Sequence, residues 1–228
     1  MTVDEQPRHA SIGSGNYALM LSAMVLVVVL SGIGGSKGVV FGPVITDAAF
    51  FMFPVAYILG DMITEIYGPL AARRAIVTGF CANGLSVLVY ALIIVLPGFT
   101  DDYGVAKQGA LEVALGPVWL VVLASMLGYA TGQSVNSLIM WTGKRRHLES
   151  RLYRRLFSSS GVGEAVDTVI FCTVASPALG IDGLGQWANY TFFGFVWKVL
   201  VQYALIPVTG RVIGWVKRHE PTYGLAAD

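Results

Sequence analysis

Long apolar stretches constrain the fold of this chain more than any other feature. Six stretches in the 228 residues carry almost no charge, each long enough to match the roughly 20 apolar residues that a helix needs to cross a bilayer. Only 13% of the residues are charged, against roughly 25% in a soluble domain. We therefore expect an all-α integral membrane protein with six transmembrane helices. The six stretches are 17–36, 46–66, 73–97, 115–141, 162–182 and 186–216.

The basic residues gather on one side of these predicted helices. The connection 143–161 is rich in Lys and Arg, and more basic residues follow the second and sixth helices, whereas the opposite side has only Lys37 and Lys107. Because positively charged loops stay in the cytoplasm, both termini are expected to be cytoplasmic. The predicted organisation is one membrane domain between two tails, with no soluble module: 1–16, 17–216 and 217–228.

Several function classes lack the motifs that they require. The sequence has no Gly-rich phosphate loop with a Walker-type Lys, so ATP-driven chemistry within this chain is not expected. It has no CxxC or HExxH, and its three His lie outside the apolar stretches, so we expect neither a metal nor another cofactor. The basic stretch 143–161 could hold anionic lipids or simply set the topology, and we prefer topology. Nothing in the charge pattern indicates nucleic acid as a partner.

Two carboxylates lie inside the second apolar stretch, in the segment GDMITEIYG at 60–68. Asp61 and Glu65 are four positions apart and therefore lie on one face of a helix. Ionised groups are costly in hydrocarbon and usually face a cavity or a partner. We expect both to face a polar interior and bind substrate, and the alternative is an ion-pair network that only fixes helix packing.

Further polar residues fall at a similar predicted depth, in the cytoplasmic halves of their helices. Gln133 and Asn136 lie in the fourth helix, and Asp167 lies in the fifth, one turn after Glu164, which is interpreted as structural. Lys198 is near the middle of the sixth helix, too deep to extend comfortably to water, so we expect an interior carboxylate partner. The candidate substrate-binding residues are Asp61, Glu65, Gln133, Asn136, Asp167 and Tyr57, and the candidate charge partners are Arg73, Lys198 and Lys37.

Together these residues resemble a known family, the queuosine precursor transporters, once described as vitamin uptake transporters. The matching motifs run from about residue 31 to 210 and are Lys37, Phe53-Pro54 with Tyr57, Gly60-Asp61 through Glu65 to Tyr67-Gly68, Ala72-Arg73, Gln133, Arg155 with Ser158-Ser159, Asp167 before Phe171, and Lys198 with Pro207. Where the family usually has Asp after the Gln, this chain has Asn136, which removes one possible proton partner. Where it usually has Ser-Thr, this chain has Ser158-Ser159.

The resemblance implies import of 7-deazaguanine precursors of queuosine, such as preQ0, preQ1 or queuine, across the bacterial cytoplasmic membrane. A guanine-like edge offers neighbouring N–H donors that one carboxylate can accept, and charge-assisted bonds of this kind are strong. Gln133 or Asn136 could bond the carbonyl and the ring nitrogens. A secondary transporter without ATP hydrolysis, rather than an enzyme, is the expected type of protein.

Two alternatives come from other classes. The chain could be the substrate-binding membrane subunit of an energy-coupled vitamin importer, which would also have six helices and a small flat ligand. Paired carboxylates also occur in intramembrane enzymes, but the apolar stretches contain no GxGD motif and no Ser/His pair. The abundant glycines allow helices to approach closely, either within one chain or in a homodimer.

Overall fold

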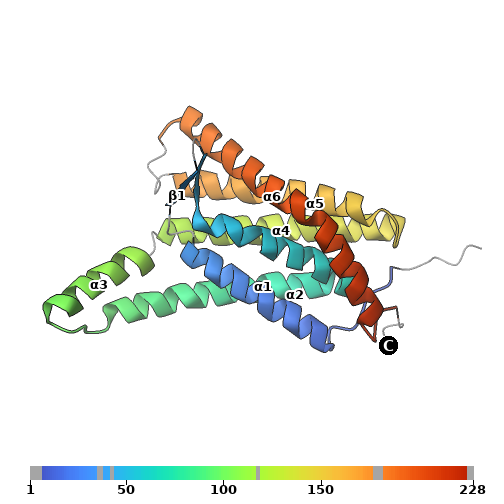
Figure 1. Cartoon of the computed structure of the whole chain (residues 1–228), viewed down its shortest axis with the longest axis horizontal. Helices are drawn as coiled ribbons and strands as arrows, with labels where there is room; N and C mark the ends of the chain where they lie inside the picture. The colour runs from blue at the N-terminus through green and yellow to red at the C-terminus, as the bar shows by residue number, and fades with distance from the viewer. Residues whose placement is uncertain (1–6, 35–37, 42–43, 117–118, 177–181, 225–228) are drawn as a thin grey trace, which may run out of the picture.

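The computed structural model describes residues 7–34, 38–41, 44–116, 119–176 and 182–224, and it is helical apart from one short hairpin (Figure 1). The helices are α1 (Gly15–Gly34), α2 (Phe53–Val95), α3 (Asp102–Leu115), α4 (Trp119–His147), α5 (Leu152–Ala175) and α6 (Leu184–His219). Between α1 and α2 lie the antiparallel strands β1 (Gly38–Phe41) and β2 (Val44–Asp47) and the 3₁₀ helix η1 (Ala48–Phe51). The expected helical class is confirmed.

Helix α2 reverses direction at Gly68. This residue has φ 84° and ψ −179°, a conformation that glycine adopts readily and that residues with a Cβ rarely adopt. Pro69 follows, and because it has no N–H it cannot continue the helical hydrogen bonds across the turn. In Figure 1 the first half of α2 (53–67) runs toward the end of the bundle that holds the chain termini, and the second half (69–95) runs back.

Contacts with α4 establish the direction of the first half. Asp61 accepts a hydrogen bond from Asn136, and the carbonyl of Glu65 accepts one from Lys144, which lies further along α4. Later residues of the first half therefore meet later residues of α4. The first half of α2 and α4 are parallel.

The second half of α2 meets α4 in the opposite order. Gly79 lies against Tyr129, whereas Gly84 lies against Met126, which comes earlier in α4. The second half is therefore antiparallel to α4 and to the first half. The two apolar stretches expected at 46–66 and 73–97 thus form a helical hairpin joined only by the turn at 68–69, without the separate connecting loop that their spacing suggested.

With α2 counted as two halves, six helical segments alternate in direction through the bundle (Figure 1). Helix α5 returns beside α4, and α6 returns beside α5. The two ends of the described chain meet at one end of the bundle, where Ser11 N donates to Thr222 Oγ1 (3.0 Å) and Gly224 N donates to the carbonyl of His9 (3.4 Å). An even number of passes brings both ends of a chain to the same side.

By length and composition, four segments of the described chain could cross a membrane: Gly15–Gly34, Phe53–Val95, Asp102–His147 and Leu184–His219. The second of these contains both halves of α2. Helix α5 is not among them because its buried face is polar. That face includes Ser159, Ser160, Glu164, Asp167 and Thr168.

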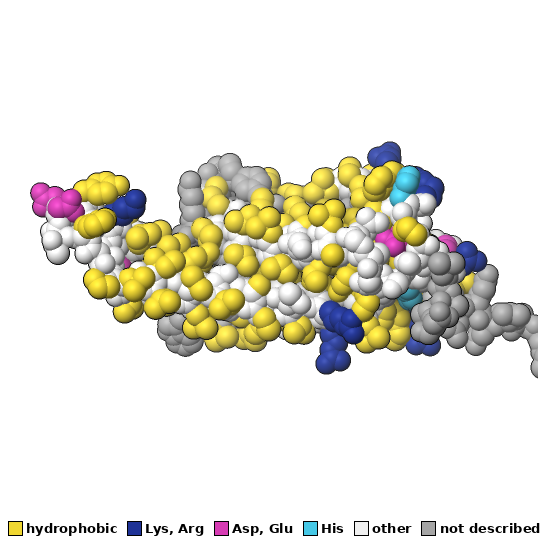
Figure 2. Space-filling view, turned by 90° about the horizontal axis from the view of Figure 1, so that it is seen from below, with side chains coloured by type: hydrophobic (Ala, Val, Ile, Leu, Met, Phe, Trp, Pro, Cys, Tyr) yellow, Lys and Arg dark blue, Asp and Glu magenta, His cyan; other side chains and the backbone are white. Residues whose placement is uncertain are grey.

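The surface of the bundle is apolar where a soluble protein would be polar. Large apolar side chains such as Leu19, Leu88 and Phe192 are exposed, and Figure 2 shows apolar side chains over most of the middle of the molecule, with Lys and Arg mainly toward the end that holds the termini. Soluble monomers rarely expose so much contiguous apolar surface. The chain is a multi-pass helical membrane protein.

Two elements were not expected from the sequence. Helix α3 lies at the far end of the bundle, in the region interpreted as a plain connection (Figure 1). Asp101 caps it by accepting a hydrogen bond from Gly104 N (2.9 Å), and Gln108 Nε2 donates to the carbonyl of Ile94 (2.8 Å), which ties α3 to α2. The hairpin of β1 and β2 comes before η1, and the end of β2 together with η1 takes up the beginning of the second apolar stretch, so the helix starts at Phe53 instead of 46.

Candidate functional site

Asp61 lies on the inward face of the first half of α2 and is almost completely buried. Its carboxylate accepts hydrogen bonds from Asn136 Nδ2 (2.7 Å), Ser159 Oγ (3.3 Å) and Ser160 Oγ (3.4 Å). All three donors are neutral, and none of the cations in the described part of the chain comes within ion-pair distance. Amide and hydroxyl donors from α4 and α5 therefore hold this carboxylate between the helices.

Glu65 lies one turn further along α2, and its surroundings are cationic. Its Oε1 is 2.7 Å from Arg155 Nη2, 2.7 Å from Lys217 Nζ and 3.6 Å from Lys144 Nζ. The three cations come from α5, α6 and α4. One buried carboxylate thus connects four helical segments at the end of the bundle that holds the termini.

One of the expected charge partners, Arg73, does not reach this region, and another lies outside the described residues. Arg73 is exposed, because the turn at Gly68 sets the phase of the second half of α2 so that Ala72 and Ala75 face inward. Lys37 lies outside the described residues. The charge that Arg73 was expected to supply comes from other helices.

The three cations that bind Glu65 were not identified as site residues from the sequence. Lys144 and Arg155 belong to the basic stretch 143–161, which was interpreted as a determinant of topology, and Lys217 was assigned to the C-terminal tail. Arg155 did carry one signal, since it is among the motifs that match the family. Nothing in the sequence spacing of Lys144 and Lys217 distinguishes them from basic residues of a loop.

Lys198 of α6 pairs with a carboxylate in the interior. Its Nζ lies 3.5 Å from Asp167 Oδ2 and 4.7 Å from the centre of the Phe53 ring. A cation over an aromatic face gains further electrostatic stabilisation. The predicted depth of Lys198 called for such a partner, and Asp167 supplies it.

Gln133 of α4 fits against α2 at a position where only glycine leaves room. A Cβ on Gly60 would lie 1.4 Å from Gln133 Nε2. Gln133 is fully buried, yet neither its Nε2 nor its Oε1 has a hydrogen-bond partner in the described structure. Buried amides are normally bonded, so this side chain presents both a donor and an acceptor to the interior.

The side chain of Tyr57 on α2 packs against both α4 and α5. It is fully buried, and its hydroxyl donates to the carbonyl of Gly163 (3.2 Å). A Cβ on Gly132 would lie 2.3 Å from this hydroxyl, so the small residue in α4 permits the approach.

Glu164 is a candidate that the sequence interpretation placed among the structural residues. It lies on α5, is fully buried, and neither of its carboxylate oxygens has a hydrogen-bond partner among the described residues. Asp167 follows one turn later on the same face. A buried carboxylate without hydrogen-bond donors is costly, and a bound ligand could supply the donors that Glu164 lacks.

Six buried polar residues on α2, α4, α5 and α6 lie between these helices, and we call them the polar interior. It consists of Asp61, Gln133, Asn136, Glu164, Asp167 and Gln202. Unpartnered atoms in it include Asn136 Oδ1 and Gln202 Oε1 as well as those of Gln133 and Glu164. Carboxylate and amide groups of this kind can bind a small polar molecule that has both donors and acceptors. In the described part of the chain, no group of His, Cys, Asp and Glu could hold a metal ion.

The two terminal segments close the bundle beside Glu65. We call 7–14 and 220–224 together the terminal clasp. Lys144 Nζ donates to the carbonyl of Arg8 (2.7 Å) and to Tyr223 Oη (3.1 Å), and Tyr223 in turn donates to Glu149 (2.7 Å). The clasp therefore shares Lys144 with the Glu65 network.

Among the ionisable groups of this region, His9 and Glu149 have lowered pKa values. Burial, together with the charge of Lys144, lowers the pKa of His9 to about 4. Burial alone would raise the pKa of Glu149, but hydrogen bonds from Lys217 and Tyr223 outweigh it and lower the pKa to about 2. The folded clasp thus favours a neutral His9 and an ionised Glu149.

Comparison with known proteins identifies relatives. A family model described as "Putative vitamin uptake transporter" matches residues 47–212, which include every member of the polar interior. No solved structure matches the chain.

One curated relative is a "Probable queuosine precursor transporter" of Bacillus subtilis (strain 168). It is 27% identical over 158 residues, which are 68% of this chain and 66% of the relative. The chain therefore spans slightly less than two thirds of the length of that protein.

Proposed function

The chain belongs to the family described as "Putative vitamin uptake transporter", and we propose that this multi-pass membrane protein is a transporter that imports a 7-deazaguanine precursor of queuosine. The name of the B. subtilis relative supports this class of substrate. preQ0, preQ1 and queuine are the candidates. The proposed location is the bacterial cytoplasmic membrane.

We propose that each of the six alternating helical segments is a membrane crossing. The bundle end with the terminal clasp would then face the cytoplasm, because Lys144, Arg155 and Lys217 lie there with the basic connection between α4 and α5. The far end, with α3, would face outward.

The polar interior is the observation that carries the proposed function. Asp61 is already held by three neutral donors, whereas Glu164 has two unpartnered oxygens. A guanine-like edge presents a ring N–H and an exocyclic amine side by side, so Glu164 is the better acceptor for it. Gln133 has the free donor and acceptor that would pair with the carbonyl and a ring nitrogen.

The proposed mechanism is secondary transport without ATP hydrolysis. Transport by the purified chain alone, in proteoliposomes without nucleotide, would support it over a subunit of an energy-coupled vitamin importer. A chain that takes up labelled precursor only with an added ATPase module would support the subunit instead.

The test of the site is uptake of labelled preQ0, preQ1 and queuine by proteoliposomes containing Glu164→Gln. Glu164→Gln keeps the shape of the side chain and removes the charged acceptor, so we expect uptake to be lost. Glu112→Gln, on an exposed position of α3, is the matched control and should transport normally. Full uptake by a folded Glu164→Gln protein would show that the assignment is wrong.

A further inference from the structure

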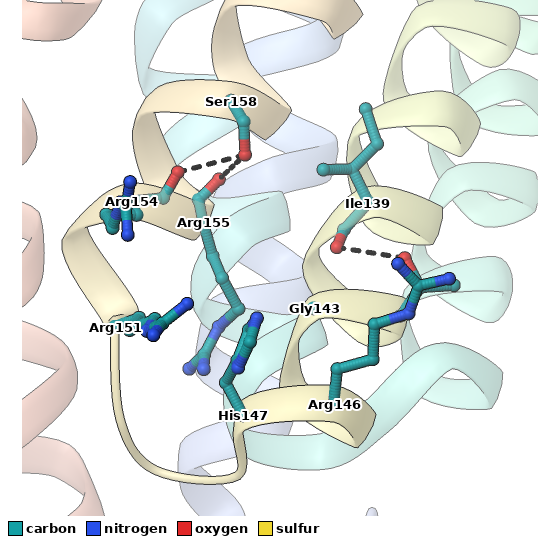
Figure 3. A pocket seen from close by; sticks show the side chains of 9 residues that line it. Ile139, Gly143, Arg146, His147, Arg151, Arg154, Arg155 and Ser158 are labelled. Carbon is teal, nitrogen blue, oxygen red and sulfur yellow. Dashed lines mark hydrogen bonds between the residues drawn. The ribbon is translucent and has the colours of Figure 1, made fainter.

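A concave pocket of about 360 Å³ lies at the corner where α4 ends and α5 begins (Figure 3). Its wall carries four arginines, and His147 lies among them: Arg146, Arg151, Arg154 and Arg155. The polar interior and the Glu65 carboxylate do not line it. The pocket is therefore a separate feature of the end that holds the terminal clasp.

The arginines of the pocket differ in their hydrogen bonds and ion pairs. Arg155 is buried, and its guanidinium donates to Glu65 and to the carbonyls of Leu148 (2.8 Å) and Ser150 (2.7 Å). These bonds brace the turn between the two helices.

Arg146, Arg151 and Arg154 are exposed, and none of them forms an ion pair with a carboxylate in the described structure. Figure 3 shows their side chains around the same opening. Three like charges around one concavity repel one another unless an anion lies between them.

The start of α5 adds a further preference for an anion. This helix of 24 residues begins at Leu152, and its N-cap residue Arg151 provides no side-chain hydrogen bond to the first turn. The unpaired N–H groups and the positive end of the helix dipole therefore face the corner. Arginine forks suit the oxygens of a phosphate group in particular.

The apolar surface next to the pocket fits a lipid. Leu138 lies one turn before Thr142 on α4, and Val162 lies one turn after Ser158 on α5, and both are exposed. Thr142 and Ser158 line the pocket. An acyl chain could lie along this surface while its phosphate reaches the arginines.

We propose that Arg146, Arg151 and Arg154 form a binding site for an anionic phosphate group at the α4–α5 corner. The phosphate can come from the headgroup of an anionic phospholipid or from a free phosphate in solution. Each arginine contributes charge-assisted hydrogen bonds, and Arg155 holds the turn that positions them.

The test measures the thermal midpoint of the purified full-length protein in neutral detergent. One arm adds phosphatidylglycerol, a second adds phosphatidylcholine, and a third adds sodium phosphate at constant ionic strength. A ligand that binds the folded state raises the midpoint. A rise with phosphatidylglycerol alone identifies a lipid headgroup as the source, and a rise with sodium phosphate as well identifies the phosphate group as sufficient.

The triple replacement Arg146→Gln, Arg151→Gln and Arg154→Gln should need at least about tenfold more ligand for the same rise. The control removes the same charge elsewhere at this end, by Arg74→Gln, Arg211→Gln and Arg218→Gln, all at exposed positions, and should behave as the wild type. If the triple variant does not fold, the single variants Arg154→Gln and Arg218→Gln are compared by the ligand concentration that each needs for the same rise in the thermal midpoint. No rise with any probe, or an equal loss in test and control variants, would overturn the proposal.

Discussion

Within one helical turn of α2, the partners of a buried carboxylate change from amide and hydroxyl donors at Asp61 to three cations at Glu65. Glu65 pairs with all three cations, and its removal would leave buried Arg155 without a carboxylate and would leave Lys144 and Lys217 with Glu149 alone. The charge of Asp61 is only solvated by neutral donors. The two positions therefore respond differently to substitution.

Glu65→Gln should lower the free energy of unfolding by about 3–5 kcal/mol, because breaking a buried ion pair leaves a buried charge, here that of Arg155, without its partner. Thermal unfolding in detergent measures the loss. Glu112→Gln in exposed α3 removes the same charge and should leave the midpoint unchanged. A Glu65→Gln protein as stable as the wild type would mean that the network does not hold the helices together.

Gly60→Ala tests the fit of Gln133 against α2. The added Cβ would lie 1.4 Å from Gln133 Nε2, so the amide has to move, and overpacking of this kind costs about 1–3 kcal/mol. We expect lower stability and weaker substrate uptake. Gly109→Ala in α3 is the matched control, because a Cβ there meets nothing within 4 Å and alanine favours the helix. Equal effects of the two substitutions would contradict the proposed packing.

Sequence reasoning placed individual residues well where depth in an apolar stretch was the deciding quantity. Asp61, Gln133 and Asn136 are all buried, and Lys198 pairs with Asp167. Arg73, expected as a charge partner, is exposed, because the phase of a helix after a sharp turn depends on the backbone angles of the turn. Whether the buried residues bind substrate is untested by the structure and stays a prediction.

At the scale of elements, α2 depends on one backbone conformation. Gly68→Ala places a Cβ at φ 84° and 3.2 Å from the His9 ring. Backbone strain of this kind costs about 1–3 kcal/mol, so the variant should unfold at a lower temperature. Gly84→Ala, in the second half of α2, makes only an ordinary contact with Met126 and serves as the control. Equal stability of the two variants would show that the turn tolerates a side chain.

Elements were predictable where the apolar stretch was long. Every helical segment of the bundle overlaps an expected stretch, since only long helices satisfy the backbone inside a bilayer. The short elements were missed, because α3 and the β1–β2 hairpin are too short to give a strong periodic signal. Asp101, a good N-cap residue, was the one local indication of α3.

At the scale of the whole molecule, the terminal clasp should weaken in acid. The pKa of His9 is about 4 in the folded protein against 6.5 for an ordinary histidine, so between these values the unfolded chain binds a proton that the folded chain does not. The contribution of neutral His9 to the free energy of unfolding is fully present above pH 6.5, and it is lost as the pH falls toward 4. The contribution of Glu149, whose pKa is about 2 against 4.5, is lost only at lower pH.

The thermal midpoint should therefore fall between about pH 7.5 and about pH 5, and His9→Gln should reduce the slope because it removes the titrating group. His219→Gln, at an exposed position, is the control and should keep the wild-type slope. A wild-type slope in His9→Gln would place the acid sensitivity elsewhere in the molecule.

The turn at Gly68 and Pro69 also limits how the bundle can open. The two halves of α2 share one pivot there and cannot separate at that end, so any relative motion between them grows with distance from it. Any such motion would be largest at the two ends of α2, Phe53 and Val95, and the Phe53 end is the one whose ring contacts Lys198. A molecule would then reach the polar interior most easily from the side of the bundle opposite to the terminal clasp.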